Sequence, residues 1–331
     1  MDKKKIILTG IFLVFLAAIM NYYYYEPSTY IARGQGTVLS DNWWEALNWI
    51  KNNTEECVTV ATYWDPGHFI TGIADRAVVF DGASQNSLLV MDVPGASGGL
   101  KIIPYDNGIK QLSMEQNGTI THARIKDIGI SLLTSNETLA LDILKNYRKP
   151  NCSEMYYIAS SDLIFKSQWW TYFATWDPTV ECDTSLCKGA KYFYSPIQFS
   201  KNTPLFFLKT VGYEYPVSDR QSFILYADNT SLHVLFQQDN NFVKVSKILL
   251  MTNEGFLAIE DPAAEMKGTV LVPGFAPGYT PDYIFYMSPE LEDAMFTKMF
   301  FLNGAGLKNF EFVNSWGNEV KLFRIKFNET S

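Results

Sequence analysis

Apolar positions in the first part of the chain follow two different periods. Residues 41–52 carry apolar side chains at i, i+3, i+4 and i+7, which predicts a helix with one buried face, capped by Ser40 or Asp41. The β-branched run at 57–62 predicts a buried strand. A Pro-Gly pair then interrupts the run, and a short helix is expected over 68–73.

The same alternation continues and predicts a mixed α/β core. Further strands are expected at 77–80, 127–134 and 155–159, and helices at 135–149 and 160–174. From residue 192 the pattern changes to short β-prone runs between Gly, Asn, Asp and Pro, which predicts an antiparallel β-rich insertion. The strands of this insertion are expected at 205–211, 222–226, 232–236, 242–251 and 270–272.

The last part of the chain returns to the pattern of the core. A strand is expected at 283–287, a helix at 290–302 that ends at Asn303 and Gly304, and a final strand at 320–327. The predicted fold class is therefore α+β, with a mixed α/β core and a β-rich insertion.

The N-terminus predicts a membrane anchor. Three lysines at 3–5 precede an apolar run at 6–20, and the tyrosines at 22–25 extend it to about the 20 residues that a bilayer needs. We therefore expect a single-pass protein of the cell membrane, with a cytoplasmic N-terminus and an extracytoplasmic main domain. A cleaved signal peptide is the alternative, but no small-x-small cleavage site follows the apolar run.

We accordingly divide the chain into four parts. They are an anchor (1–26), an α/β core (27–190), a β-rich insertion (191–280), and a core helix with the terminal strand (281–331).

The composition narrows the classes of function that are compatible with this chain. Hydrophobic residues make up 47% of the 331 residues, which is ample for a core, and the aromatic content of 15% is high. The net charge of −8, without a long basic stripe beyond the N-terminus, argues against nucleic-acid binding.

Cys182 and Cys187 enclose a short polar loop and could form a local disulfide. Zinc ligation is the alternative, but no Cys-x-x-Cys pair exists and His is scarce, so no metal site is predicted.

Two segments carry candidate chemistry. Tyr63, Trp64 and Asp65 follow the strand at 57–62, where two rings, an indole N–H and a carboxylate can hold a small hydroxyl group. The alternative is structural, with Asp65 capping the helix that begins near residue 67. Asp162 and Lys166 are four residues apart on one helix face and can pair, although a surface ion pair without function is the default for such residues.

These segments, in this order, resemble one family. Tyr63-Trp64-Asp65-Pro66-Gly67 is similar to the Trp-Trp-Asp-Tyr-Gly motif of the oligosaccharyltransferase catalytic subunit of archaeal type, in its extracytoplasmic C-terminal region. The Asp162…Lys166 helix resembles the second motif of that family. The segment at 295–310 is the third element of the match. The chain departs from the family motif at Tyr63, which replaces a Trp, and at Pro66, which replaces a Tyr.

The resemblance implies a function for these residues. In the family the motif holds the hydroxyl of the Ser or Thr in an Asn-x-Ser/Thr acceptor (the sequon), so Tyr63, Trp64 and Asp65 would bind it, with Asp162 and Lys166 lining the pocket. The implied activity is glycosyl transfer, a lipid-linked oligosaccharide being the donor and an acceptor polypeptide the second substrate.

The resemblance also implies that the chemistry lies elsewhere. The multi-spanning region of the family, whose carboxylates bind a divalent metal (Mg or Mn), has no counterpart in this sequence, so no catalytic residue and no metal ligand is predicted in this chain. A separate multi-spanning catalytic partner would then supply them. The alternative is a non-catalytic, membrane-anchored paralogue or accessory subunit that binds peptide or protein.

Overall fold

The computed structural model describes residues 12–16, 18–20, 22–23, 39–181, 188–199, 206–210, 222–227, 232–238, 241–252, 255–273 and 283–327. The chain divides into two compact units, Met1–Trp44 and Glu45–Ser331, and each is considered by itself. Most of the predicted anchor lies outside the described residues. Among those that are described, no helix combines the length and the apolar character that crossing a membrane requires.

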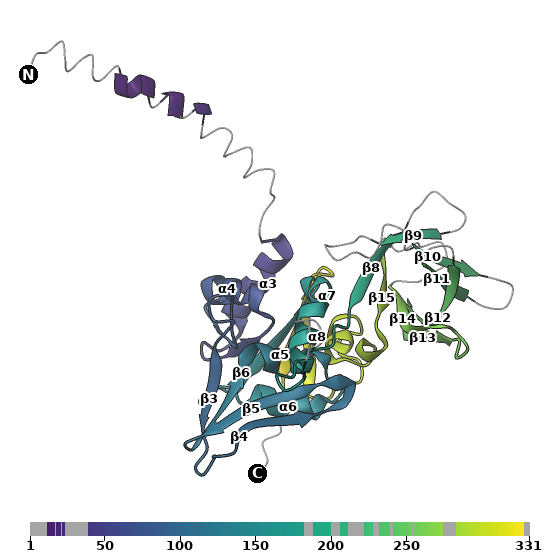
Figure 1. The fold of residues 1–331 in the computed structure, drawn as a ribbon. Helices are drawn as coiled ribbons and strands as arrows, with labels where there is room; N and C mark the ends of the chain where they lie inside the picture. Colours follow the sequence, from purple (N-terminus) through teal and green to yellow (C-terminus); the bar gives the residue numbers. More distant parts are fainter. Residues whose placement is uncertain are drawn as a thin grey trace, which may run out of the picture. The chain divides into compact units, whose positions relative to one another are not determined.

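The second unit contains a five-stranded mixed sheet, and the strands of its other two sheets are labelled in Figure 1. The strand order is β16-β17-β7-β1-β2, and β1 runs parallel to both of its neighbours. Four of the five strands were predicted, whereas β16 was not. The five strands are β1 (Thr59–Ala61), β2 (Ala77–Val78), β7 (Met155–Ser160), β16 (Phe310–Trp316) and β17 (Val320–Ile325).

Helices flank this sheet and share its hydrophobic core. Asn136 caps α6, accepting hydrogen bonds from the backbone N–H groups of Thr138 and Leu139. The predicted helices at 41–52, 135–149 and 160–174 are present, the last divided into two, and the one at 290–302 is shortened to a 3-10 turn and a single short helix. The helices are α3 (Asp41–Asn53), α4 (Trp64–Phe69), η2 (Ile70–Ala74), η3 (Asp106–Gly108), α5 (Arg124–Leu133), α6 (Glu137–Lys145), α7 (Asp162–Phe165), α8 (Ser167–Thr175), η4 (Pro289–Leu291) and α9 (Met295–Phe300).

The strand predicted at 127–134 is wrong, because these residues form most of α5. Ile128, Ile130 and Leu132 alternate with smaller residues, which imitates the period of a strand, although all residues of α5 from Lys126 to Leu133 are buried. Gly129 lets it approach α8 closely. A Cβ atom at this position would lie 2.7 Å from the carbonyl oxygen of Trp170 and 3.1 Å from the amide nitrogen of Ala174.

A second, antiparallel sheet of four strands was not predicted. Its order is β3-β6-β5-β4, and its side chains are mostly half-buried or exposed, which leaves little hydrophobic pattern to detect. The strands are β3 (Leu88–Asp92), β4 (Gly99–Pro104), β5 (Lys110–Gln116) and β6 (Thr119–Ala123).

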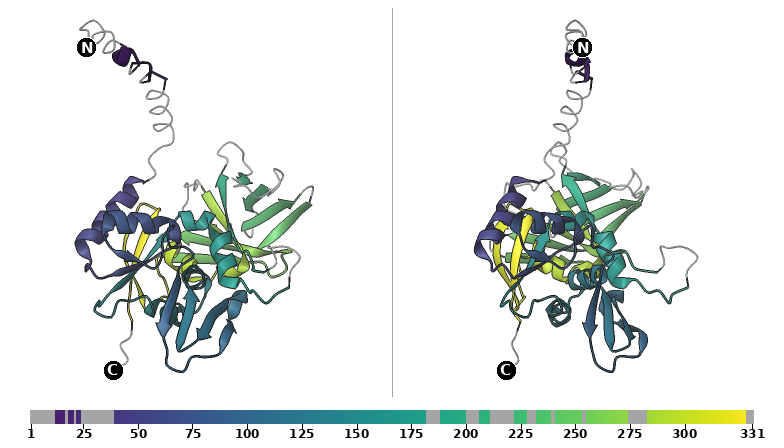
Figure 2. Two further views of the ribbon diagram at one scale, coloured as in Figure 1. Left: turned by 60° about the vertical axis from the view of Figure 1, so that its left-hand side comes forward. Right: turned by 90° about the vertical axis from the view of Figure 1, so that its left-hand side faces the viewer.

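The predicted β-rich region is an eight-stranded sheet with the order β11-β10-β9-β8-β15-β14-β12-β13 (Figure 2). An additional pairing of β11 with β12 makes the sheet curl back on itself. It is antiparallel as predicted, except that β12 and β14 run parallel. The strands are β8 (Tyr194–Phe199), β9 (Phe206–Thr210), β10 (Ser222–Ala227), β11 (Leu232–Gln238), β12 (Asn241–Thr252), β13 (Gly255–Glu260), β14 (Met266–Val272) and β15 (Tyr283–Met287).

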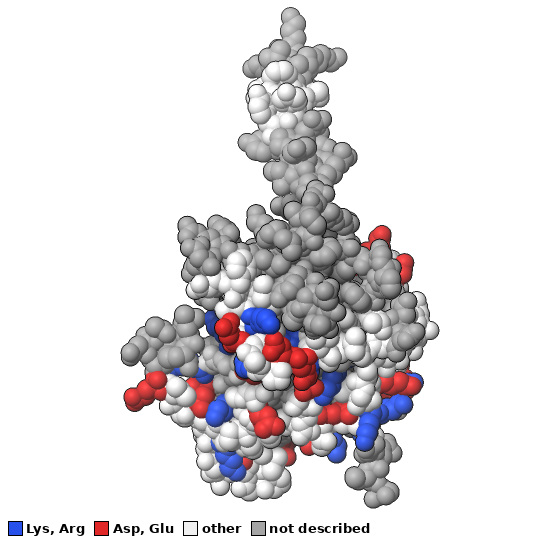
Figure 3. Space-filling model, turned by 90° about the vertical axis from the view of Figure 1, so that its right-hand side faces the viewer, with Lys and Arg blue, Asp and Glu red and all other residues white. Residues whose placement is uncertain are grey.

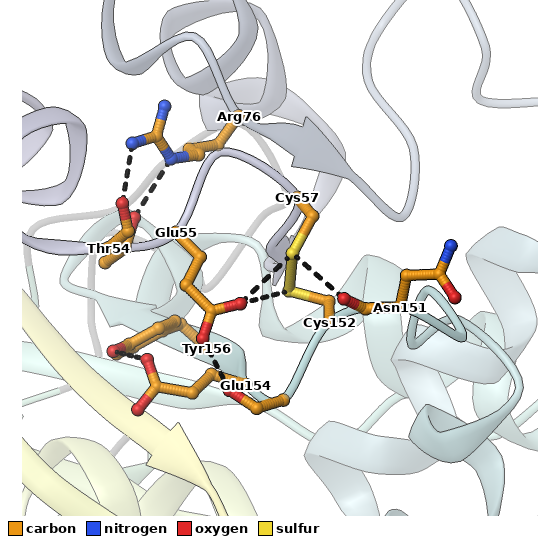
Figure 4. Close-up of a disulfide and its surroundings, with 9 residues drawn as sticks. Thr54, Glu55, Cys57, Arg76, Asn151, Cys152, Glu154 and Tyr156 are labelled. Atoms are coloured by element: carbon orange, nitrogen blue, oxygen red, sulfur yellow. Dashed lines mark hydrogen bonds between the residues drawn. A yellow bond between two sulfur atoms is a disulfide. The ribbon is translucent and has the colours of Figure 1, made fainter.

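A disulfide joins Cys57 and Cys152, with 5.6 Å between the Cα atoms (Figure 4). Cys57 precedes β1 and Cys152 precedes β7, so the bond connects the amino ends of two adjacent parallel strands. The predicted local disulfide of Cys182 and Cys187 lies outside the described residues.

Candidate functional site

The site lies at the carboxyl ends of β1 and β7, opposite the disulfide. In parallel neighbours these ends meet at one edge of the sheet, where crevices form. β1 ends at Ala61 and α4 begins at Trp64, four residues before the predicted start. Trp64 and Asp65 therefore lie in the first turn of a helix and not at the end of a strand. Pro66 did not prevent this early start, because a first-turn residue needs no backbone N–H for the helix ladder.

Tyr63 packs in the core beside the site. Only 1% of its surface is exposed, and its ring packs edge-on against Phe80 and Trp64. Burial and the nearby Asp65 carboxylate raise the pKa of the phenol, and a hydrogen bond with the Trp64 side chain partly offsets this. Tyr63 thus belongs to the core, whereas Trp64 is only partly buried.

Lys166 brings two carboxylates together. Its Nζ lies 2.7 Å from Oδ2 of Asp65 and 2.8 Å from Oδ2 of Asp162. Burial lowers the pKa of Lys166, but the two carboxylates outweigh burial and raise it above its ordinary value. Asp65 follows β1, whereas Asp162 and Lys166 follow β7, so the parallel pairing of the strands creates the cluster.

The three charged side chains are 29–33% exposed, so the cluster is open to a ligand on one side. Oδ2 of Asp65 is buried and contacts Lys166. The exposed part of the Asp65 side chain is therefore not this oxygen. Asp162 is fixed further by the hydroxyl of Ser160, which donates to Oδ1. Ser160 was not predicted as a residue of the site. Its position as the last residue of a buried strand, two before the carboxylate, was the available signal.

Close packing against the end of β2 sets the position of α4. A Cβ atom on Gly67 would lie 2.7 Å from the carbonyl oxygen of Phe80 and from Cβ of Asp81, so only glycine fits without a shift. The Asp81 carboxylate binds the backbone and hydroxyl of Ser84, and the hydroxyl bond is the main cause of its lowered pKa. His68 of α4 lies 3.7 Å from the same carboxylate, which adds a weak link between the two segments.

Trp170 and Lys298 make structural contacts. Trp170 is fully buried, and its indole N–H donates to the carbonyl of Leu163 at 2.9 Å. Trp169 is 52% exposed. Lys298 donates to the carbonyl of Ser135 at 3.3 Å.

The described residues do not fit a Mg²⁺ or Mn²⁺ site. Their one group of three close ligand atoms is Glu55, Cys57 and Cys152, two of which are sulfurs. Hard cations of this kind prefer cages of oxygen ligands. No step of a reaction is therefore assigned to such an ion at this site.

The fold is similar to that of a solved structure. The structure is similar to the C-terminal domain of PglB from C. jejuni, with a TM-score of 0.50, 14% identity, and 86% of this chain and 99% of that chain covered. No family model matches the chain.

Two curated proteins are similar to the chain in sequence. A dolichyl-phosphooligosaccharide-protein glycotransferase of Methanococcus voltae is 22% identical over 92% of this chain and 38% of its own length. Its counterpart in Methanocaldococcus jannaschii is 48% identical over 48 residues, 14% of this chain and 5% of its own length. The chain is thus similar to these glycotransferases in sequence and to a C-terminal domain in fold, as the resemblance of the motifs predicted, and it spans less than half the length of the relatives.

Proposed function

We propose that this chain is the sequon-recognising part of an oligosaccharyltransferase, and that Asp65 accepts a hydrogen bond from the Ser or Thr hydroxyl of an Asn-x-Ser/Thr acceptor. The observation that supports this is the contact of Lys166 with both Asp65 and Asp162. The Asp65 carboxylate, which contacts this ammonium group, can only accept hydrogen bonds and therefore selects a donor.

Trp64 and Tyr63 contribute to this binding in different ways. Trp64, partly buried beside Asp65, supplies an apolar surface for the acceptor side chain. Tyr63 is buried and positions Trp64 without touching the peptide. A ligand that lacks the hydroxyl would leave a carboxylate oxygen without a partner, and such sites discriminate strongly against it.

The transfer step belongs to the rest of the system. In this proposal the acceptor amide nitrogen attacks the sugar of a lipid-linked oligosaccharide, and the lipid phosphate leaves. The catalytic carboxylates and the Mg²⁺ or Mn²⁺ are assigned to a multi-spanning region or partner. The chain itself binds and orients the acceptor. It does so from the extracytoplasmic face, anchored through residues 1–26.

Photo-crosslinking of a peptide tests the proposal. A benzophenone-bearing Asn-x-Thr peptide is expected to label the chain, whereas the near-isosteric Asn-x-Val peptide is expected to label it poorly. Asp65→Ala should abolish the preference for Thr. Asp92→Ala removes the same charge from an exposed position on β3 and should leave labelling unchanged. Equal labelling by both peptides, or full labelling of the Asp65 variant, would refute the assignment.

A further inference from the structure

A carboxylate lies directly beside the disulfide. Oε2 of Glu55 is 3.2 Å from Sγ of Cys57 and 3.5 Å from Sγ of Cys152 (Figure 4). The sulfurs of a disulfide carry no proton, so these contacts are not hydrogen bonds. The other oxygen, Oε1, accepts a hydrogen bond of 2.5 Å from the hydroxyl of Ser153.

This carboxylate makes no ion pair with any of the residues that the structure describes. None of the ion pairs between these residues includes Glu55. Several lysine and arginine side chains pair with other acids, and Figure 3 shows mixed red and blue groups on one face of the molecule. Glu55 is exposed, so a cation from solvent can reach it.

The spacing between the carboxylate oxygen and each sulfur is close to that of ligands on one metal ion. Zn–S bonds of about 2.3 Å and Zn–O bonds of about 2.1 Å, at tetrahedral angles, put sulfur and oxygen about 3.6 Å apart and the two sulfurs about 3.8 Å apart. The two sulfur–oxygen distances in the structure are already close to the first value. Only the sulfurs have to separate, and rotation of the cysteine side chains provides that once their bond is broken.

We propose that, in the reduced protein, Glu55, Cys57 and Cys152 form a binding site for a thiophilic divalent cation such as Zn²⁺. Two thiolates and one carboxylate leave a fourth position for water, or for the carbonyl oxygen of Asn151, which is 3.9 Å from Sγ of Cys57. Ser153 orients the carboxylate, as residues behind a metal ligand commonly do.

The redox step is an ordinary thiol–disulfide exchange. A dithiol reductant supplies two electrons and two protons, the sulfur–sulfur bond breaks, and the reductant becomes a disulfide. The cation then displaces the two thiol protons, which pass to solvent. Because Cys57 and Cys152 precede β1 and β7, the bound ion would join the same two strand ends that the disulfide joins in the oxidised protein.

A cadmium titration tests the site. The full chain carrying Cys182→Ser and Cys187→Ser, which leaves one thiol pair, is reduced with a phosphine, desalted without oxygen, and titrated with Cd²⁺. We expect an ultraviolet thiolate-to-metal charge-transfer band that saturates at one ion per chain, and competition by Zn²⁺. The oxidised protein should give no band.

Two matched variants test the ligand set. Glu55→Gln should weaken Cd²⁺ and Zn²⁺ binding by about tenfold or more, whereas Glu56→Gln, an exposed neighbour, should not. Circular dichroism checks that each reduced variant is folded. The proposal is overturned if the folded, reduced chain shows no band, or if Glu55→Gln binds both ions as tightly as Glu56→Gln.

Discussion

At the scale of single residues, Lys166 is the link between two parts of the sequence. Asp162 is its helical neighbour, and this pair was predicted from the spacing alone. Asp65 joins through the strand pairing. Since all three side chains are about one-third exposed, solvent screens the charges, and the cluster contributes little to stability. We infer that its purpose is to hold the Asp65 carboxylate in place.

Replacing Lys166 should therefore affect binding more than folding. Lys166→Met leaves two carboxylates facing each other, and we expect peptide labelling to fall about tenfold or more, while the free energy of unfolding changes by less than about 1 kcal/mol. Labelling and urea denaturation of the same samples measure both quantities. A large loss of stability with intact labelling would show instead that the cluster is structural.

At the scale of elements, the contact of α5 with α8 depends on a glycine. Gly129→Ala places a Cβ atom against the backbone of α8, and the helices must move apart. We expect a loss of about 1–3 kcal/mol of stability, as for other overpacked cores. Gly72→Ala, at an exposed position of η2, meets open space and should be neutral or stabilising. Equal effects in thermal or urea unfolding would contradict the close packing.

The disulfide is the second feature at this scale. It closes a loop with a sequence separation of 95 residues, for which chain entropy predicts about 4–5 kcal/mol of stabilisation at most. Cys152→Ser, in the presence of a chelator, should therefore lower the urea midpoint strongly. Because the bond joins the strands that carry Asp65 and Asp162, sequon labelling should weaken as well. Unchanged stability in the variant would show that the bond is dispensable.

At the scale of the whole molecule, a buried His-Asp pair makes the folding free energy depend on pH. His122 of β6 lies 3.4 Å from the carboxylate of Asp127 in α5, and Tyr147 donates to the same oxygen at 2.7 Å. The interaction with Asp127, partly offset by burial, raises the pKa of His122. Arg124 and Lys126 are the other charged groups near this cluster, through Tyr147 and Asp127 respectively.

The sign of this dependence follows from the raised pKa. Stabilisation by His122 is fully present below about pH 6.5, its unfolded pKa, and is lost as the pH rises through the higher folded value. We expect His122→Gln to destabilise the protein by about 1.5 kcal/mol at pH 5.5, the scale of a hydrogen bond to a charged group, and by less at pH 8.5. Urea denaturation of both proteins at the two pH values measures the difference. A constant difference would exclude a protonated His122.

Local sequence determined much of this protein. The helical period at 41–52, the β-branched strands and the turn-rich insertion were readable because each pattern is set by neighbours along the chain. The Asp162–Lys166 pair was readable for the same reason. The apolar residues of α5 alternate as in a strand, so this helix was predicted as a strand. The β3-β6-β5-β4 sheet has only a weak hydrophobic pattern, so it was missed.

Only the tertiary structure decided the pairings between distant segments. The sequence identified Asp65 and Lys166 as candidates, but their contact requires β1 and β7 to be parallel neighbours. The same pairing brings Cys57 to Cys152 and Glu55 to both, whereas the sequence suggested a bond between Cys182 and Cys187. The physical reason is that local patterns fix the type of an element, while the choice of its neighbours depends on packing the entire core.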